Sequence, residues 1–213
     1  MAAQPRPVPQ LYLVAPASGD TAGLASTLTE LTGIADVAAV LLQLPEDTDR
    51  ALKQYVTKLA PPVQNAGAAL LIERRVDIAL RVAADGAHLT GIEAFTAAVA
   101  SLKPQSIAGA GGLISRHDAM LAGQADADYV MFGEPDAQGQ RPSFDTVVER
   151  VAWWSEVFQP PCVGYAGELS EVRPLVAAGA DFIAVGGFVF HSAQPSAMLK
   201  EVAAHLLCEE PAQ

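Results

Sequence analysis

Short apolar segments recur along the chain, and each is separated from the next by a stretch with apolar residues at helical spacing. Most of these segments are continuously hydrophobic rather than alternating, which is typical of parallel strands covered on both faces. The pattern predicts eight strands, over residues 10–16, 37–44, 68–73, 86–89, 106–112, 128–133, 161–167 and 182–190.

The stretches between these strands carry helix signals. The segment 143–158 has apolar side chains three and four residues apart and stops before two prolines, which predicts an amphipathic helix. Ser115, with Asp118 three residues later, predicts a capping arrangement at the start of another helix. Gly33 and Gly179 each follow a helical pattern and are predicted to end it in a left-handed conformation.

Three similar junctions lead from a helix into a strand: "VAADGAHL", "ADADYVMFG" and "AAGADFIAVGG" each place a small residue and an aspartate before an apolar run. Strict alternation of about eight strands with helices favours an α/β fold, a closed (β/α)8 TIM barrel forming a single domain over residues 10–207. An open doubly wound sheet is the alternative. Residues 1–9 and 208–213 are expected to be loose terminal segments.

Composition and charge narrow the class. The chain has 213 residues, of which 51% are hydrophobic and 17% charged, and this suits one packed domain. A net charge of −11 argues against a nucleic-acid partner. The apolar runs are too short to span a bilayer, and the N-terminal residues lack the apolar core of a signal peptide, so no membrane partner and a cytoplasmic location are expected. Cys162 and Cys208 are too few for a disulfide framework.

In a barrel of this kind, the ligand site is built from residues at the carboxyl ends of the strands. The seventh and eighth strands carry Ala166-Gly167 and Gly186-Gly187 there. Glycine lets the backbone approach an anion, and backbone N–H groups can then hold a phosphate, so a phosphorylated small molecule is the expected partner. The alternative is that these glycines only permit tight turns.

Further polar or aromatic side chains fall near other strand ends: Gln43, Arg74, His88, Glu93, Glu134 and Tyr165. Glu134 follows Gly133 and is a candidate acid or base, with a solvated loop carboxylate as the alternative. For His88, within an apolar strand, a hydrogen-bonded structural imidazole is favoured over a catalytic one. Trp153 and Trp154 point to different sides of one helix, which predicts one ring against the barrel and one at a homodimer interface.

Three segments form an ordered series that resembles the thiamine phosphate synthase and thiazole tautomerase family: "LLIERRVDIALRVAADGAHLTG", "ADYVMFG" and "VGYAGELSEVRPLVAAGADFIAVGGFVF". The resemblance covers the chain from the second strand to the eighth. It implies a barrel that joins a hydroxymethylpyrimidine diphosphate to a thiazole phosphate with Mg²⁺ and releases pyrophosphate. Tautomerase members of the family instead isomerise a thiazole carboxylate phosphate.

The resemblance also implies roles for individual residues, and the chain departs from the family pattern at several of them. Gln43 is retained as a catalytic position, but the basic residues expected after it are absent. Arg74 stands where the family has a metal-binding aspartate, which leaves Glu93 as the expected carboxylate for Mg²⁺. Glu134 replaces the histidine of the tautomerases, and Tyr165 replaces an aliphatic residue and is expected to narrow the pocket.

We therefore expect a synthase-like protein with slow condensation and weak Mg²⁺ binding. Two alternatives stay open: a non-catalytic paralogue that binds a ligand or a partner protein, and an isomerase that uses Glu134. The expected roles are catalysis for Gln43 and Glu134, phosphate binding for Ala166, Gly167, Gly186 and Gly187, pocket lining for Arg74, His88 and Tyr165, and metal binding for Glu93.

Overall fold

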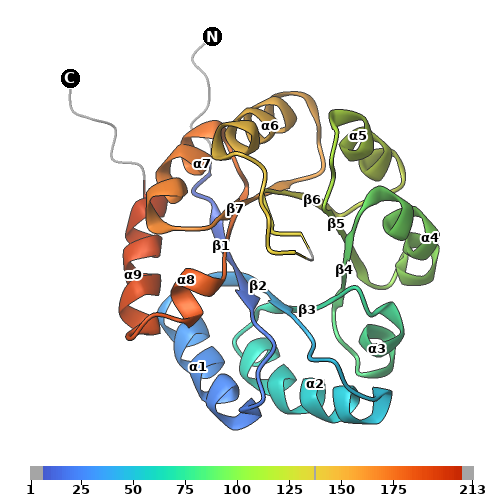
Figure 1. The fold of residues 1–213 in the computed structure, drawn as a ribbon, viewed down its shortest axis with the longest axis vertical. Helices are drawn as coiled ribbons and strands as arrows, with labels where there is room; N and C mark the ends of the chain where they lie inside the picture. The colour runs from blue at the N-terminus through green and yellow to red at the C-terminus, as the bar shows by residue number, and fades with distance from the viewer. Residues whose placement is uncertain (1–6, 137, 208–213) are drawn as a thin grey trace.

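The computed structural model describes residues 7–136 and 138–207. Within this part of the chain, parallel strands form a closed barrel in which each strand pairs with the next and β8 pairs with β1 (Figure 1). The predicted (β/α)8 barrel is therefore confirmed. The strands are β1 (Gln10–Ala15), β2 (Val37–Leu42), β3 (Ala69–Glu73), β4 (Gly86–Thr90), β5 (Ile107–Gly111), β6 (Tyr129–Phe132), β7 (Cys162–Ala166) and β8 (Phe182–Val185).

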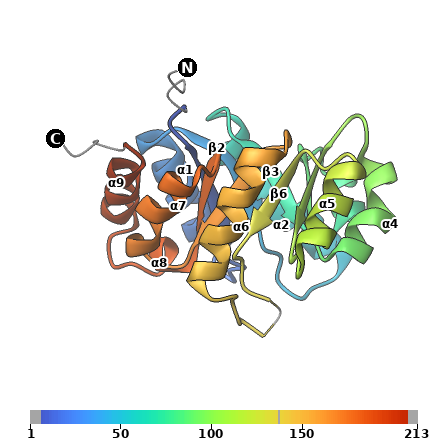
Figure 2. The ribbon, with the colours of Figure 1, turned by 90° about the horizontal axis from the view of Figure 1, so that it is seen from above.

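Helices follow the strands and surround the barrel, and the loop between β6 and α6 lies over the barrel opening in Figure 1 and projects beyond one end of it in Figure 2. None of the described helices is both long and apolar enough to cross a membrane. The helices are α1 (Thr21–Ile34), α2 (Asp49–Gln64), α3 (Val76–Arg81), α4 (Ile92–Leu102), α5 (Arg116–Gln124), α6 (Phe144–Val157), the 3₁₀ turn η1 (Leu169–Glu171), α7 (Val172–Ala178), α8 (Gly187–Phe190) and α9 (Pro195–Leu206).

Local sequence signals placed two helix ends correctly and one wrongly. Ser115 and Asp118 form a capping box at the start of α5, with both reciprocal hydrogen bonds present. Gly179 ends α7 in the left-handed conformation, with φ of 93°. The prediction for Gly33 is wrong, because α1 continues through it to Ile34 and Ala35 forms the C-cap in extended conformation.

The last predicted strand is too long. β8 stops at Val185, and the apolar residues after it form the short helix α8 instead of continuing the strand over 186–190. The carbonyl of Gly186 accepts hydrogen bonds from the backbone N–H groups of Val189 and Phe190. An apolar run of this length fits a buried strand and a buried helix equally well, so hydrophobicity alone did not separate the two.

The repeated small-residue and aspartate junction has one structural purpose. Asp85, Asp128 and Asp181 lie directly before β4, β6 and β8. Each carboxylate accepts a hydrogen bond, at 2.7–2.8 Å, from a backbone N–H in the first two residues of the neighbouring strand that comes earlier in the chain. The donors are Leu70 in β3, Ala108 in β5 and Cys162 in β7. These N–H groups lie at the amino ends of the strands. The motif therefore joins neighbouring strands at the end of the barrel opposite the expected site.

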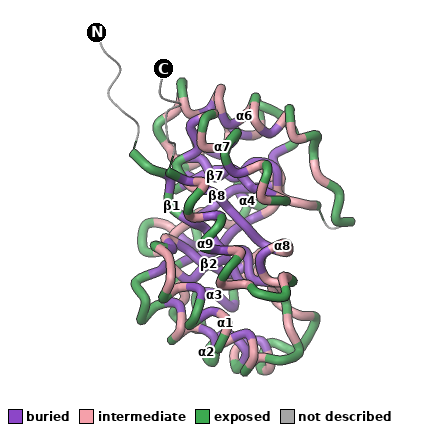
Figure 3. The backbone as a smooth tube through the Cα atoms, turned by 90° about the vertical axis from the view of Figure 1, so that its left-hand side faces the viewer, coloured by how far each residue is buried: buried purple, intermediate pink, exposed green. Residues whose placement is uncertain are grey.

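The buried residues form two layers, which appear as the purple inner parts of the tube in Figure 3. One layer lies between the barrel and its helices, and the other fills the barrel interior. Gly109 makes room for the interior layer, because a Cβ at this position would lie 2.1 Å from the Tyr129 ring. The interior layer consists of Tyr12, Val14, Ala39, Leu41, Leu71, Tyr129, Met131, Val163, Tyr165 and Ala184.

The tandem tryptophans of α6 differ in burial, as predicted. Trp154 is fully buried, stacks on Phe158 at 4.3 Å between ring centroids and donates a hydrogen bond to a backbone carbonyl. Trp153 is half-buried, and the Arg116 guanidinium lies 4.9 Å from the centre of its ring. One turn further along α6, Val157 is 62% exposed. The outer face of α6 thus presents an aromatic and an apolar side chain.

Candidate active site at the carboxyl end of the barrel

Two cavities open at the carboxyl end of the barrel, and both are lined by Met131, Glu134 and Pro135. The central cavity, of about 190 Å³, is lined by Val14, Pro16, Leu41, Gln43, Glu73, Met131, Glu134, Pro135, Tyr165, Gly187 and His191. The side cavity, of about 450 Å³, extends under the loop after β6 and is lined by Thr90, Gly112, Leu113, Ile114, Met131, Phe132, Gly133, Glu134, Pro135, Asp136, Gln140, Arg141, Pro142 and Arg150. Glu134 therefore stands between the two cavities.

A chain of hydrogen bonds runs from Glu134 into the barrel interior. Glu134 Oε2 lies 2.9 Å from His88 Nε2, His88 Nδ1 lies 2.8 Å from the Tyr129 hydroxyl, and that hydroxyl lies 2.8 Å from the Tyr12 hydroxyl. The His88 side chain is 1% exposed and that of Glu134 is 12% exposed. His88 is therefore the hydrogen-bonded buried imidazole expected from its apolar strand, and Glu134 is not a solvated loop carboxylate.

Two glycines allow Glu134 to reach His88. A Cβ at Gly111, at the end of β5, would lie 2.3 Å from Glu134 Oε1 and 2.4 Å from His88 Nε2. No side chain fits there without displacing the pair. Gly133, directly before Glu134, has φ of 95° and lies in the left-handed region, which other residues adopt at a cost.

Tyr12 and Tyr129, the two tyrosines in this series of hydrogen bonds, are held in the neutral form. Burial raises the pKa of Tyr12 well above its ordinary value, although the hydrogen bond with Tyr129 acts in the opposite direction. Burial also raises the pKa of Tyr129, and the neighbouring Tyr12 and Glu134 add to the rise. Both side chains therefore stay phenols at any ordinary pH and can each donate one hydrogen bond.

Gln43 and Tyr165 both line the central cavity, as their predicted positions require. Gln43 follows β2 and is half-buried, while Tyr165 lies in β7 and is 8% exposed. Burial raises the pKa of the Tyr165 hydroxyl, and the charge of Arg141 and a backbone hydrogen bond from Gly187 partly offset the rise. Tyr165 and Gly187, the first residue of α8, therefore both border the central cavity.

The glycines expected to bind phosphate differ in their surroundings. The N–H of Gly167 donates to Glu171 Oε2 at 2.6 Å, so this donor is already engaged by a carboxylate of the same chain. Ala166 is fully buried as the last residue of β7, and a Cβ at Gly186 would lie 2.9 Å from the Tyr165 hydroxyl. Gly187 begins α8 and lines the central cavity.

Arg141 holds the carboxylate that engages Gly167. Its guanidinium donates to Glu171 Oε2 at 2.9 Å and to the carbonyl oxygens of Gly133 and Tyr165 at 2.8 and 3.0 Å. The side chains of Arg141 and Glu171 are 23% and 13% exposed. This pair fixes the loop after β6 against the end of β7, and the sequence reasoning missed both residues.

Arg74 and Glu93 do not reach either cavity. Arg74 is exposed in a left-handed conformation with φ of 61°, and its N–H donates to the carbonyl of His88. Glu93 is exposed in the first turn of α4. The prediction that Arg74 lines the pocket is therefore wrong, because the side chain at this strand end that lines the central cavity is that of Glu73.

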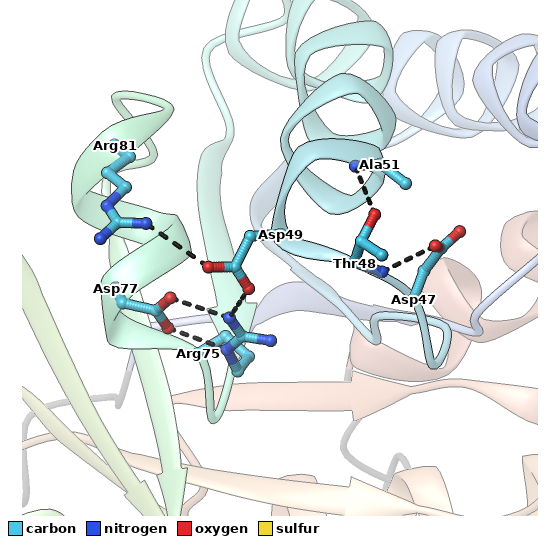
Figure 4. Close-up of polar contacts among 7 residues, drawn as sticks. All are labelled: Asp47, Thr48, Asp49, Ala51, Arg75, Asp77 and Arg81. Carbon is cyan, nitrogen blue, oxygen red and sulfur yellow. Dashed lines mark hydrogen bonds and ion pairs between the residues drawn. The ribbon is translucent and has the colours of Figure 1, made fainter.

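The neighbouring Arg75 is also directed away from the site, into a surface network between α2 and α3 (Figure 4). Its guanidinium contacts Asp77 at 2.8 Å and Asp49 at 2.6 Å, and Arg81 reaches the same Asp49 at 3.5 Å. The hydrogen bonds that Arg75 donates to Asp77 and Asp49 raise the pKa of its guanidinium. The hydrogen bond from Arg75 lowers the pKa of the Asp77 carboxyl. These charges are exposed and link two helix starts.

A family model described as thiamine monophosphate synthase matches residues 11–189, which is most of the barrel. The chain belongs to the thiamine monophosphate synthase family. The predicted family is thus confirmed, and the function is thiamine phosphate synthase-like.

Relatives of this synthase family support the assignment over nearly the full chain. A thiamine-phosphate synthase of Rhodospirillum centenum is 37% identical over 90% of this chain and 95% of its own length. One of Hyphomonas neptunium is 34% identical over 93% and 94% of the two chains. The structure of the thiamine phosphate pyrophosphorylase of Pyrococcus furiosus matches with a TM-score of 0.75 at 22% identity, covering 93% of this chain and 97% of that one, and shows the shared fold.

Within the synthase-family barrel, the sequence reasoning also missed Tyr12 and Tyr129. Tyr12 and Tyr129 each interrupt an apolar strand with a hydroxyl. A buried hydroxyl needs a partner, so two such residues within apolar strands were a detectable sign of polar side chains that contact each other in the barrel interior.

Proposed function

We propose that this chain binds a phosphorylated thiazole- or pyrimidine-like molecule in the central cavity and condenses a hydroxymethylpyrimidine diphosphate with a thiazole phosphate, releasing pyrophosphate. The proposal depends on one observation, the central cavity at the carboxyl end of the barrel, which Gln43, Glu134, Tyr165 and Gly187 all line. In barrels of this class, catalysis takes place at this end. The membership of the chain in the synthase family supports the choice of substrates.

Gly187 is the proposed anchor for the phosphate group. A Cβ at Gly187 would meet nothing closer than His191 Nδ1 at 3.6 Å, so a ligand oxygen has room beside this backbone, where it would share the Gly187 N–H with the Tyr165 hydroxyl. Gly167 is a weaker candidate than the sequence suggested, because a bound phosphate must first displace the Glu171 carboxylate from its N–H. Gly186 and Ala166 are buried beside these positions, and we propose that they contribute only backbone to the phosphate site.

Neither Glu93, the expected Mg²⁺ ligand, nor Arg74, at the position of the family's metal-binding aspartate, fits a metal site. Arg74 is cationic and exposed, and Glu93 is exposed on α4. Within residues 7–136 and 138–207, no group of three or more His, Cys, Asp and Glu side chains is placed to hold a metal ion. A Mg²⁺ ion can be held by one or two carboxylates together with substrate phosphates, and in the central cavity only Glu73 and Glu134 could take that role, with the substrate phosphates supplying the rest. Weak Mg²⁺ binding therefore remains part of the proposal.

The side chains of the central cavity offer little stabilisation to the pyrophosphate leaving group. Departure of pyrophosphate requires cations against its oxygens, and the residues lining the central cavity include two glutamates and no lysine or arginine. Arg141 is engaged by Glu171 and two carbonyls. Gln43 and Tyr165 can orient a ring through hydrogen bonds. We therefore expect condensation well below the ~1 per second of an ordinary enzyme.

A second candidate function is isomerisation of a thiazole carboxylate phosphate. The observation that favours it is Glu134, whose side chain lines both cavities and has one buried carboxylate oxygen without a hydrogen-bond partner among the residues that the structure describes. A partly desolvated carboxylate hydrogen-bonded to an imidazole is suited to taking and returning a proton. A non-catalytic paralogue that uses the same cavity only for binding is the remaining alternative.

The proposal also covers the cellular location, oligomeric state and partners of the protein. A cytoplasmic location and a homodimer are expected, with no nucleic-acid or membrane partner. The net charge of −11 supports the absence of a nucleic-acid partner.

Two measurements on the purified chain test the proposed function. Calorimetry with thiazole phosphate measures binding, and a coupled pyrophosphate-release assay with both substrates and Mg²⁺ measures condensation. We expect binding together with slow, weakly Mg²⁺-dependent turnover, and we expect Arg74→Asp not to increase it, because the side chain at this position lies outside the cavity. Binding without turnover would support the non-catalytic or isomerase alternatives. An absence of binding would refute the proposal.

A further inference from the structure

One buried oxygen in the site is without a partner. Glu134 Oε1 is the buried side-chain polar atom with no hydrogen-bond partner within the described residues. A buried carboxylate oxygen without a partner costs free energy, so such atoms occur where a ligand or another group completes them. Glu134 lines both the central and the side cavity. The unfilled acceptor therefore belongs to the ligand site.

The direction of the hydrogen bonds behind Glu134 follows from counting donors. Tyr12 and Tyr129 are neutral phenols with one hydrogen each. If Tyr12 donates to Tyr129 and Tyr129 donates to His88 Nδ1, the imidazole hydrogen is on Nε2 and faces the Glu134 carboxylate. Every donor in this direction has an acceptor. The reverse direction requires either a protonated Glu134 or a doubly protonated imidazole, and in both cases it leaves the Tyr12 hydrogen with no acceptor among the side-chain contacts of the described residues.

We propose that Tyr12, Tyr129 and His88 act as positioning residues that hold Glu134 as an ionised carboxylate, whose unpartnered oxygen accepts a hydrogen bond from an amino-bearing nitrogen heterocycle in the ligand site. Tyr129 selects the imidazole tautomer, and His88 anchors one oxygen of Glu134. The other oxygen is left for the ligand. This inference rests on the proposed function because it assigns the ring of the ligand to the same site.

The character of the central cavity agrees with a ring that donates hydrogen bonds. Glu73, Glu134 and the amide oxygen of Gln43 are acceptors, and no lysine or arginine is among the lining residues. An anionic group is disfavoured beside two carboxylates, whereas an amino group on an aromatic ring finds acceptors there. The phosphate of the same ligand is then expected at Gly187, which also lines this cavity.

The state of His88 is measured without any ligand. Nitrogen-15 NMR of the imidazoles, with His88→Gln used for assignment, is expected to show His88 as a neutral ring with its hydrogen on Nε2. Tyr129→Phe removes the donor to Nδ1 and is expected to populate both tautomers. Tyr55→Phe is the matched control, because the Tyr55 hydroxyl accepts a hydrogen bond from the Ser18 N–H and takes no part in the hydrogen bonds that connect Tyr12, Tyr129, His88 and Glu134. A hydrogen on Nδ1 in the wild-type protein overturns the inference, whether or not the variants fold.

The role of the free oxygen is tested with a fragment that has no phosphate. The probe is 4-aminopyrimidine, with unsubstituted pyrimidine as the comparison, and binding is followed by chemical-shift changes at His88. We expect the amino compound to bind more tightly, and Glu134→Gln to weaken its binding about tenfold, as expected for loss of one charge-assisted hydrogen bond. Glu93→Gln, an exposed carboxylate outside both cavities, is expected to have no effect.

The outcomes separate this inference from the proposed function. If Glu134→Gln leaves the affinity for 4-aminopyrimidine unchanged while the wild-type protein binds thiazole phosphate, the inference is wrong and the proposed function stands. If the wild-type protein binds 4-aminopyrimidine but not thiazole phosphate, the proposed function fails and the role of Glu134 stands. Equal binding of pyrimidine and 4-aminopyrimidine also overturns the inference.

Discussion

Glu134 Oε2 lies 2.9 Å from Nε2 of His88, although the two residues are 46 positions apart and come from different strand ends. The contact connects an acidic residue at the mouth of the barrel to a histidine that is buried in its wall. It makes the loop after β6 part of the site rather than a surface connection. Its dependence on neighbouring residues leads to the first prediction.

Replacing Gly111 with alanine should separate Glu134 from His88. The added methyl group would lie 2.3–2.5 Å from the carboxylate oxygens and the imidazole, so the pair must move apart. We expect a loss of about 1–3 kcal/mol in the free energy of unfolding, measured with urea. Gly33→Ala is the control, since nothing lies within 4 Å of its Cβ position in helix α1, and it should be neutral or slightly stabilising. Equal stability of the two variants would show that the pair tolerates displacement.

Replacing Glu171 with glutamine should increase the affinity for inorganic phosphate. The neutral amide no longer competes as an anion for the Gly167 N–H, and the charge of Arg141 is left unpaired. We expect at least a severalfold gain in calorimetry and a loss of about 1–3 kcal/mol in stability. Glu168→Gln, on an exposed neighbour, should change neither quantity. Unchanged phosphate affinity in Glu171→Gln would place the anion site away from Gly167.

Replacing Gly187 with leucine should abolish binding of phosphorylated ligands and leave the barrel folded. A Cβ at this position has only the His191 ring within 4 Å, at 3.6 and 3.8 Å, and a leucine side chain is expected to occupy the space proposed for the ligand oxygen. Gly19→Leu, at another open glycine, is the control. Calorimetry with thiazole phosphate and circular dichroism check the two parts of the prediction. Wild-type affinity in the folded Gly187→Leu variant would move the phosphate site elsewhere.

Cys162 should resist thiol reagents while the protein is folded. Burial raises the pKa of this thiol from 9.0 to about 12, so the reactive thiolate is scarce at pH 8. Because the folded-state pKa is raised, the associated stability is present below pH 9 and is lost as the pH rises toward 12. The test is labelling of a Cys208→Ser variant with and without urea. Rapid labelling without urea at pH 8 would contradict the prediction; Cys208 itself lies outside the described residues.

The outer face of α6 should form a symmetric homodimer. Trp153 is half-buried, and Val157, one turn later, is 62% exposed on the same side of the helix. Val157→Glu should convert a dimer into a monomer in light scattering, because a charge replaces an apolar contact. Leu80→Glu, at a 50% exposed leucine on α3, is the control and should remain dimeric. A monomeric wild-type protein at all accessible concentrations would rule out this interface.

Local patterns in the sequence were sufficient to predict most of the strands and helices of the barrel. The buried strands are continuous apolar runs, the capping box at Ser115 is complete within four residues, and the aspartate junctions repeat a short phrase. Each of these depends on neighbours close in the chain, so each is visible without the fold. Where the local pattern was ambiguous, as after Val185, the boundary was wrong because an apolar run suits a buried strand and a buried helix alike.

The sequence by itself determined that a barrel forms, that Gln43, Glu134, Tyr165 and Gly187 lie at its carboxyl end, and that the chain resembles thiamine phosphate synthases. The tertiary structure alone decided which of these residues meet. It brought His88 and Tyr129 behind Glu134, occupied the Gly167 amide with Glu171, and placed Glu73 rather than Arg74 at the cavity. The reason is physical: closing the barrel sets the rotation of each strand, and a change of one position along a strand turns a side chain from the interior to the helices.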